Sequence, residues 1–516
     1  MRDPVNASTP SSSPLPIVAA ESDSATRPGS LIPHRSWRLG AAPMTIVALL
    51  WVGVYDDVTA RTLPPGGPLW AAAGVSLGAL LASWVFAVGP AATCQRSGLS
   101  TFDQLGCALG VWGRDRVASW ALGIAGLLLL VLAVHFAVEL SFAGLNALGG
   151  LDPIAPQRFG WVSSDPVRWI TTTTWAVVLA LVGCSTLFTR MVLMLVKFGT
   201  VLPPLALGTI FLITLADWSG IGTLVEGLEQ GAGGGPEVAL GGSRLDEAVL
   251  ASRGPDAWLG LAIGLDAVAA VGLVVAWFLA DWGATLKTRG ELKLTAAVGV
   301  GVAVATACLL ALAVVALRQS AEGWGMVENP LETLTFHRVV WNERAVAAGG
   351  WRGIALGVAA VILACASLAH GVFAAHWGNL GLRRVTPAAP PIRWAWAIGG
   401  VAAILTLIGL GDRPAWLWLA VAGLVGPLAA VLAVQARRGI PEDPTLVPRW
   451  RAAGLIAWVL GVLVAGIGLA VRVSGGLEGR GEAVPFAILS TLSATVAAAA
   501  GHLAASRLGR STHPSR

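Results

Sequence analysis

The chain has 516 residues, of which 55% are hydrophobic and only 12% are charged, and its mean hydropathy is +0.72. Soluble globular chains carry about 25% charged residues, so this composition excludes a soluble multidomain enzyme, a disordered chain, a coiled coil and a disulfide-stapled domain. The apolar runs are continuous over roughly 20 residues, the length of a membrane-spanning helix, whereas a membrane β-barrel has shorter alternating strands. We therefore expect an all-α polytopic membrane protein.

The apolar segments predict about twelve membrane-spanning helices. They cover residues 40–61, 69–90, 116–147, 170–189, 192–215, 257–282, 293–317, 353–377, 393–411, 414–435, 452–471 and 483–506. The tryptophans often fall near the ends of these segments, which is typical of interfacial belts. The five cysteines have no metal-type spacing, so we interpret them as packing residues and expect no metal site and no cofactor.

The segments before, between and after these helices suggest four regions. Residues 1–36 are rich in Ser, Pro and Ala and predict a disordered cytoplasmic tail, without the apolar core of a signal peptide. We expect a ten-helix core over residues 37–435, two accessory transmembrane helices over 436–506, and a cytoplasmic tail over 507–516.

Charge is distributed unevenly between the two sets of loops. Basic residues gather in one set, at Arg96, Arg114, Arg116, Arg190, Lys287, Arg289, Lys293, Arg383, Arg384, Arg393, Arg437, Arg438, Arg449 and Arg451, and in the C-terminal tail. The opposite loops are acidic or mixed, the longest being 216–256. Because basic loops remain in the cytoplasm, both termini are predicted to be cytoplasmic in a plasma (inner) membrane. The net charge of +5 then reflects topology and membrane lipids, and we expect no nucleic-acid partner.

Ionisable residues interrupt the predicted spans 1 and 3. Asp56 and Asp57 end span 1, where they line a pathway or mark the outer end of the helix. His135 and Glu139 in span 3 are four residues apart and share one helix face. They form either a titratable site or a structural pair that locks span 3 to a neighbour.

Spans 6 and 8 carry the remaining unusual residues. Asp266 lies in the middle of span 6, whose glycines, Gly272 among them, allow bending or close approach. His370 lies in the middle of span 8, and His376 is interpreted as interfacial. Spans 1 and 6 are the first members of two five-helix halves, which predicts a 5+5 inverted repeat with broken helices 1 and 6, followed by two C-terminal helices.

Several short motifs resemble the nucleobase:cation symporter family, the permeases of cytosine, purines, allantoin and hydantoins. These motifs are Arg96-Ser-Gly-Leu-Ser, Leu109-Gly-Val-Trp-Gly113, His135-Phe-Ala-Val-Glu139, Leu279-Ala-Asp281-Trp282, the stretch Ala364–Asn379, and Arg451-Ala-Ala-Gly-Leu-Ile-Ala-Trp-Val-Leu-Gly461. The resemblance implies a LeuT-type fold, a substrate site between spans 1, 3, 6 and 8, and transport of a small solute without an obligate protein partner.

The chain departs from that family at the positions that bind ligands. Against the family pattern, His135 replaces a stacking aromatic residue, Glu139 replaces an amide, His370 replaces an asparagine, and Gly272 occupies a stacking position. Ala364 and Cys365 stand where some members have sodium-binding hydroxyls. Because a hard cation needs oxygen ligands, a proton is favoured over sodium as the coupling ion.

The sequence therefore predicts a proton-coupled permease for a small polar, nucleobase-like solute, and not an enzyme. The predicted substrate-binding residues are His135, Glu139, Asp266, Gly272 and His370, and the predicted coupling residues are Asp56, Asp57 and Glu139. Two alternatives remain open: a LeuT-type carrier of amino acids or betaine-like solutes, and a non-transporting membrane protein or membrane-embedded enzyme.

Overall fold

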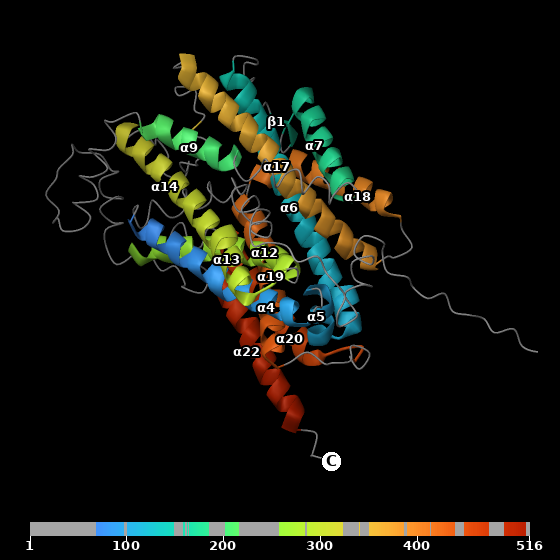
Figure 1. Ribbon diagram of the computed structural model, residues 1–516. Helices are drawn as coiled ribbons and strands as arrows, with labels where there is room; N and C mark the ends of the chain where they lie inside the picture. Colours follow the sequence, from blue (N-terminus) through green and yellow to red (C-terminus); the bar gives the residue numbers. More distant parts are fainter. Residues whose placement is uncertain are drawn as a thin grey trace, which may run out of the picture.

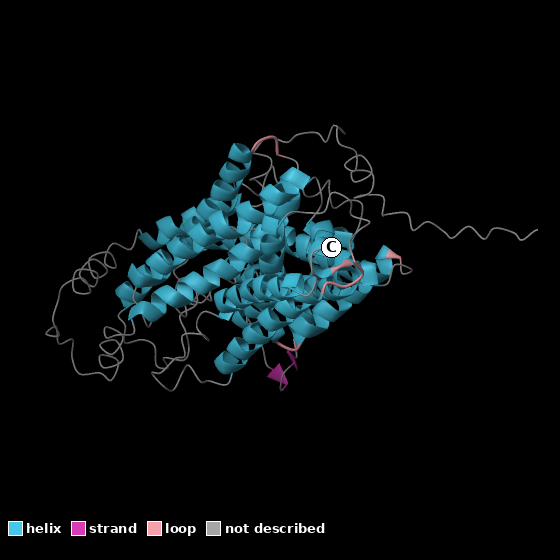
Figure 2. Ribbon diagram, turned by 90° about the horizontal axis from the view of Figure 1, so that it is seen from below, coloured by secondary structure: helices cyan, strands magenta, loops and turns pink. Residues whose placement is uncertain are grey.

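The structure is a computed structural model, and it is almost entirely helical in the part that it describes (Figures 1 and 2). It describes residues 69–97, 101–148, 158–159, 162–163, 165–184, 202–215, 257–283, 286–322, 340, 350–385, 390–412, 414–438, 448–473 and 490–511. Two short antiparallel strands, β1 (Arg158–Phe159) and β2 (Val162–Ser163), lie at the edge of the helical body in Figure 2.

The first described helix spans residues 69–97 and contains a π-helical segment. The named helices in chain order are η1 (Ala82–Ala87), α4 (Val88–Ser97), α5 (Thr101–Leu109), η2 (Gly113–Ala118), α6 (Ser119–Ala147), α7 (Pro166–Cys184), α9 (Leu202–Leu215), α12 (Ala257–Gly283), α13 (Arg289–Ala296), η3 (Ala297–Val302), α14 (Ala303–Glu322), α17 (Gly350–Val385), α18 (Pro391–Leu407), η5 (Leu410–Asp412), α19 (Pro414–Arg438), α20 (Ala452–Val473) and α22 (Ser490–Ser511).

Predicted spans 2 to 12 coincide with helices in the described residues, whereas span 1 (40–61) lies outside them. Of the helix ends that the structure describes, those of spans 2 and 8 differ most, since the first described helix continues to Ser97 rather than residue 90. Span 8 is longer than predicted, because α17 continues to Val385. The last described helix spans Ser490–Ser511 and so continues five residues past the predicted end of span 12 at residue 506.

Seven of the described helices are long and apolar enough to cross a membrane. Large apolar side chains also cover their outer surfaces, at Leu80, Trp84, Ile354, Val358, Ile456, Leu463 and Ile467. A soluble protein rarely exposes so many such residues on neighbouring helices, but a hydrocarbon environment requires them. The chain is therefore a polytopic α-helical membrane protein.

Helices α6 and α17 are the longest pair, and they lie side by side and antiparallel (Figure 1). Glycines bring their backbones together. A Cβ atom added to Gly126 would lie 2.4 Å from the backbone nitrogen of Gly378, and one added to Gly144 would lie 3.2 Å from the carbonyl oxygen of Gly357. Small residues at both ends of the contact fix its register, as is common where helices pack inside a membrane.

Helix α12 packs equally closely on the helix of residues 69–97. A Cβ atom on Gly74 would lie 2.3 Å from the carbonyl oxygen of Leu261, and one on Gly272 would lie 1.9 Å from the Cβ of Ala82. Helix α12 runs without interruption from Ala257 to Gly283, in contrast to the break predicted for span 6. Its Gly272 serves close packing and does not bend the helix.

Three π-helical segments occur in the described residues: η1, η2 and η3. Two of them, η1 and η3, lie in spans 2 and 7, the second members of the two predicted five-helix halves. They also meet, since a Cβ atom on Gly301 of η3 would lie 2.9 Å from the Oγ of Ser83 in η1. The same rare irregularity in both helices supports the inverted repeat.

Candidate functional site

Asp266 is fully buried in the middle of α12, and it caps another helix. Its Oδ1 accepts hydrogen bonds from the backbone N–H groups of Thr491 at 3.1 Å and Leu492 at 3.0 Å, and Oδ2 lies 3.4 Å from the Thr491 nitrogen. These N–H groups belong to the first turn of α22, where a helix has no carbonyl oxygen of its own to accept them. The carboxylate also faces the positive end of the helix dipole. Asp266 thus fastens α22 to α12.

We expect Asp266→Ala to lower the free energy of unfolding by about 1–3 kcal/mol, because two buried N–H groups lose their acceptor. Asp266→Asn keeps one side-chain oxygen and should lose clearly less. Thermal unfolding of the purified protein in detergent measures both variants. Equal unfolding temperatures for the wild type and the Ala variant would show that the cap contributes nothing.

Glu139 is paired with an arginine that the sequence analysis did not single out. Its Oε1 forms an ion pair with Nη2 of Arg168, in the first turn of α7, and the two side chains are 25% and 19% exposed. The pair links α6 to α7 near the start of α7. Arg168 could not be identified in the sequence, because it lies 29 residues from Glu139 beyond the loop that separates the two helices.

His135 is buried beneath the short helix η5. A Cβ atom on Gly411 would lie 2.6 Å from the His135 Cβ, so only glycine fits above the imidazole. His135 is nine residues, or two and a half helical turns, from both Gly126 and Gly144. It therefore projects from the side of α6 opposite to α17, and the α6 backbone separates it from that helix.

His370 lies on nearly the same face of α17 as Trp377, the residue that contacts α12. It is 5% exposed and sits seven residues, about two turns, before Trp377. The indole of Trp377 meets that of Trp277 of α12 edge to face, with ring centroids 6.3 Å apart. His376 faces another neighbour, since its Nδ1 lies 3.1 Å from the Gly183 carbonyl oxygen of α7.

Of the remaining predicted residues, Gly272 is tightly packed, and the two aspartates of span 1 are not described by the structure. Gly272 is covered by Ala82, and that contact leaves no space for a solute between the two residues. Asp56 and Asp57 lie outside the described residues. Of the predicted set, His370 is therefore the residue that shares a helix face with Trp377, which contacts α12.

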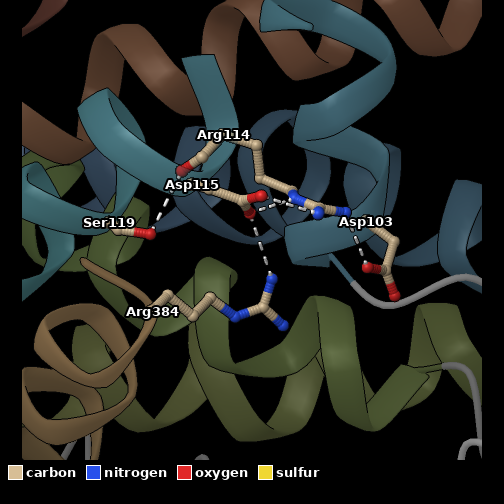
Figure 3. Close-up of polar contacts among 5 residues, drawn as sticks. All are labelled: Asp103, Arg114, Asp115, Ser119 and Arg384. Carbon is tan, nitrogen blue, oxygen red and sulfur yellow. Dashed lines mark hydrogen bonds and ion pairs between the residues drawn. The ribbon is translucent and has the colours of Figure 1, made fainter. Parts of the chain in front are cut away.

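Charged side chains gather where α5 and η2 begin and α17 ends (Figure 3). Arg114 is paired with Asp115 (Nε to Oδ1, 2.6 Å) and with Asp103 (Nη1 to Oδ1, 3.3 Å). Arg384 reaches Asp115 at 3.9 Å, and its guanidinium lies 4.0 Å from the ring centroid of Phe102. We call this group the arginine end of α17. Its side chains are partly exposed, as expected at a membrane surface.

Backbone hydrogen bonds beside the arginine end join two motifs that lie far apart in the sequence. Trp112 N–H donates to the Arg449 carbonyl at 2.9 Å, and Arg451 N–H donates to the Leu109 carbonyl at 2.9 Å. Gly110 has φ +85°, and a Cβ atom there would lie 2.6 Å from the Arg449 oxygen, so glycine is required. This contact fastens the start of α20 to the core.

Comparison with solved structures gives the fold of this arrangement. A closed form of Mhp1, a nucleobase-cation-symport-1 family transporter with bromovinylhydantoin bound, is similar at TM-score 0.51 and 13% identity, covering 93% of this chain and 94% of that one. The inward-facing conformation of Mhp1 gives TM-score 0.51 and 14% identity over 94% and 93%. A substrate-bound, outward-open Na⁺-coupled sialic acid symporter gives 0.55 and 13% over 90% of each chain.

These similarities establish a LeuT-type fold. No protein-family profile matches the chain, and no curated protein matches it. Identities of 13–14% show the fold alone, and the two proteins, Mhp1 and the sialic acid symporter, are described with different solutes. The solute must therefore be argued from the residues of this chain.

Proposed function

We propose that the chain is a secondary active transporter, a symporter that moves a small polar, nucleobase-like heterocyclic solute by alternating access. The observation that carries this proposal is the buried His370 of a LeuT-type fold, which lies on the same face of α17 as the Trp377 contact with α12. An imidazole is costly inside an apolar helix bundle unless it serves a pathway or a partner. Its two ring nitrogens can donate and accept hydrogen bonds, as an amide-bearing heterocycle requires.

We propose a proton as the coupling ion. Mhp1 is described as a cation symporter and the sialic acid carrier as Na⁺-coupled. In this chain Ala364 and Cys365 of α17 stand where the family resemblance implies sodium-binding hydroxyls; neither offers a side-chain oxygen, and Cys365 is exposed. Sodium prefers oxygen ligands, whereas His370 can itself take up a proton.

The proposed orientation places the arginine end of α17 in the cytoplasm of a plasma membrane. Arg114, Arg384 and Arg449 gather at that end of the molecule. Basic residues next to membrane spans favour the cytoplasmic side. With twelve predicted spans, an even number, we propose that both termini are cytoplasmic.

A thermal-shift screen tests which solutes bind. We expect at least one nucleobase or hydantoin to raise the unfolding temperature of the purified protein, because a ligand that binds only the folded state stabilises it by mass action. The shift should depend on pH and should be the same with and without sodium. A shift produced only by amino acids or betaines would replace the heterocyclic solute with that class, and a strict sodium requirement would contradict proton coupling.

A further inference from the structure

Trp277 and Trp377 form an aromatic contact between two helices that otherwise belong to different packing groups. Both indoles are buried, at 4% and 8% exposure, and their planes cross at 81°. This edge-to-face arrangement is a favoured geometry for aromatic rings. Both rings are covered by protein, unlike the tryptophans of an interfacial belt, which face the lipid headgroups.

The backbone packing explains why large side chains are needed there. Among the described helices, α12 packs closely against η1, α4 and α19, whereas α17 packs against α6, α7, α9 and α18. The two indoles extend across the space between these groups. Two bulky rings that meet edge to face can separate without breaking a backbone contact.

Along α17, the tryptophan pair lies between His370 and the arginine end. His370 lies about two turns before Trp377, and the arginine end, with Arg383 and Arg384, lies just beyond Trp377. The rings therefore stand between the proposed solute-facing histidine and one surface of the membrane. The buried Phe373 lies between His370 and Trp377 along the helix and adds an apolar wall.

We infer that Trp277 and Trp377 form a gate that closes the path between His370 and the arginine end of α17. The inference rests on the proposed transport function and adds which residues close one side of the pathway. With the rings in contact, a solute at His370 is separated from the arginine end. Movement of α12 away from α17 parts the rings and opens that side.

Cysteine labelling tests the gate without any solute. His370→Cys is introduced after the five native cysteines are replaced by alanine, and the protein is reconstituted in vesicles. A charged, membrane-impermeant methanethiosulfonate reagent is added only on the side of the arginine end. We expect slow labelling with both tryptophans present, and labelling at least tenfold faster in Trp277→Ala or Trp377→Ala.

Three controls make the result specific. Arg383→Cys should react rapidly in every background, which shows that the reagent reaches that side. Trp418→Ala removes another buried tryptophan, in α19, and should leave the labelling rate within twofold. Trp277→Phe keeps an aromatic ring, so labelling at position 370 should stay slow. It can be measured even if an alanine variant fails to fold, and fast labelling in it would count against an aromatic contact as the barrier. Unchanged labelling in folded Trp277→Ala and Trp377→Ala proteins would overturn the gate.

The assay separates this inference from the proposed function. Faster labelling in the alanine variants supports the gate even if the solute screen gives no shift. Unchanged labelling together with a solute shift rejects the gate and leaves the transport proposal standing.

Discussion

Gly272→Ala is expected to destabilise the protein by about 1–3 kcal/mol or more, the usual cost of forcing extra atoms into a packed interior. The added Cβ would lie 1.9 Å from the Ala82 Cβ and 2.8 Å from the Ala82 Cα, distances at which one helix must move. Ala82→Gly should restore stability when combined with Gly272→Ala. Removing the Ala82 methyl group makes room for the methyl group added at position 272. Thermal unfolding and the monodisperse fraction in detergent report both effects.

Gly208→Ala is the matched control for that pair of variants. It lies in α9, where an added Cβ meets no atom within 4 Å. Alanine there should be neutral or stabilising by about 0.5–1 kcal/mol, since glycine is a poor helix former. If Gly272→Ala behaves like Gly208→Ala, or if Ala82→Gly gives no recovery, the contact between α12 and η1 is not as close as the structure places it.

His370→Gln is expected to reduce solute uptake into proteoliposomes at least tenfold while leaving the unfolding temperature within a few degrees of the wild type. Glutamine can still form hydrogen bonds but cannot take up a proton, so coupling should be lost before folding is affected. His376→Gln is the control on the same helix. Its imidazole bonds to the Gly183 carbonyl oxygen of α7, away from α12, and we expect uptake within twofold of the wild type.

Two results would contradict this role of His370. Uptake by His370→Gln at the wild-type rate, with the same dependence on an imposed pH gradient, would remove His370 from the pathway. Equal losses in His370→Gln and His376→Gln would indicate that both histidines serve packing.

The fold was largely predictable because each membrane span must satisfy its own backbone hydrogen bonds and therefore appears as a long apolar run. For spans 2 to 12, most of the helix ends that the structure describes lie within a few residues of the predicted ones. The apolar pattern could not locate the end of α17, because Arg383 and Arg384 belong to the helix although they lie at its polar end. It also suggested a break in span 6 that α12 does not have, since a glycine can indicate either a bend or a close contact.

The candidate site was less predictable, because the spacing of residues along one helix does not indicate their partners on other helices. Helical spacing placed His135 and Glu139 on one face, but the ion pair of Glu139 is formed with Arg168 of α7. Asp266 is costly inside a membrane, and the cost is offset by the first turn of α22, more than 220 residues later in the chain. Only the packing of α12 against its neighbours reveals these partners.

Two of the motifs that carry the family resemblance contain glycines that allow close backbone contacts. The motif from Leu109 to Gly113 and the motif that starts at Arg451 are bonded to each other through their backbones. Their shared requirement is close approach: a Cβ on Gly454 would lie 2.1 Å from the Ala108 oxygen. Such residues indicate the fold and carry no information about the solute.

Uptake of a labelled heterocycle, chosen from the thermal-shift screen, into proteoliposomes with an imposed pH gradient tests most directly whether this bundle is a proton-coupled carrier. We expect accumulation above the external concentration when the outside is acidic, its collapse when a protonophore removes the gradient, and no change when sodium is replaced by potassium. Uptake that never exceeds equilibration, or that requires sodium and ignores the pH gradient, would contradict proton-coupled transport through the space between α12 and α17.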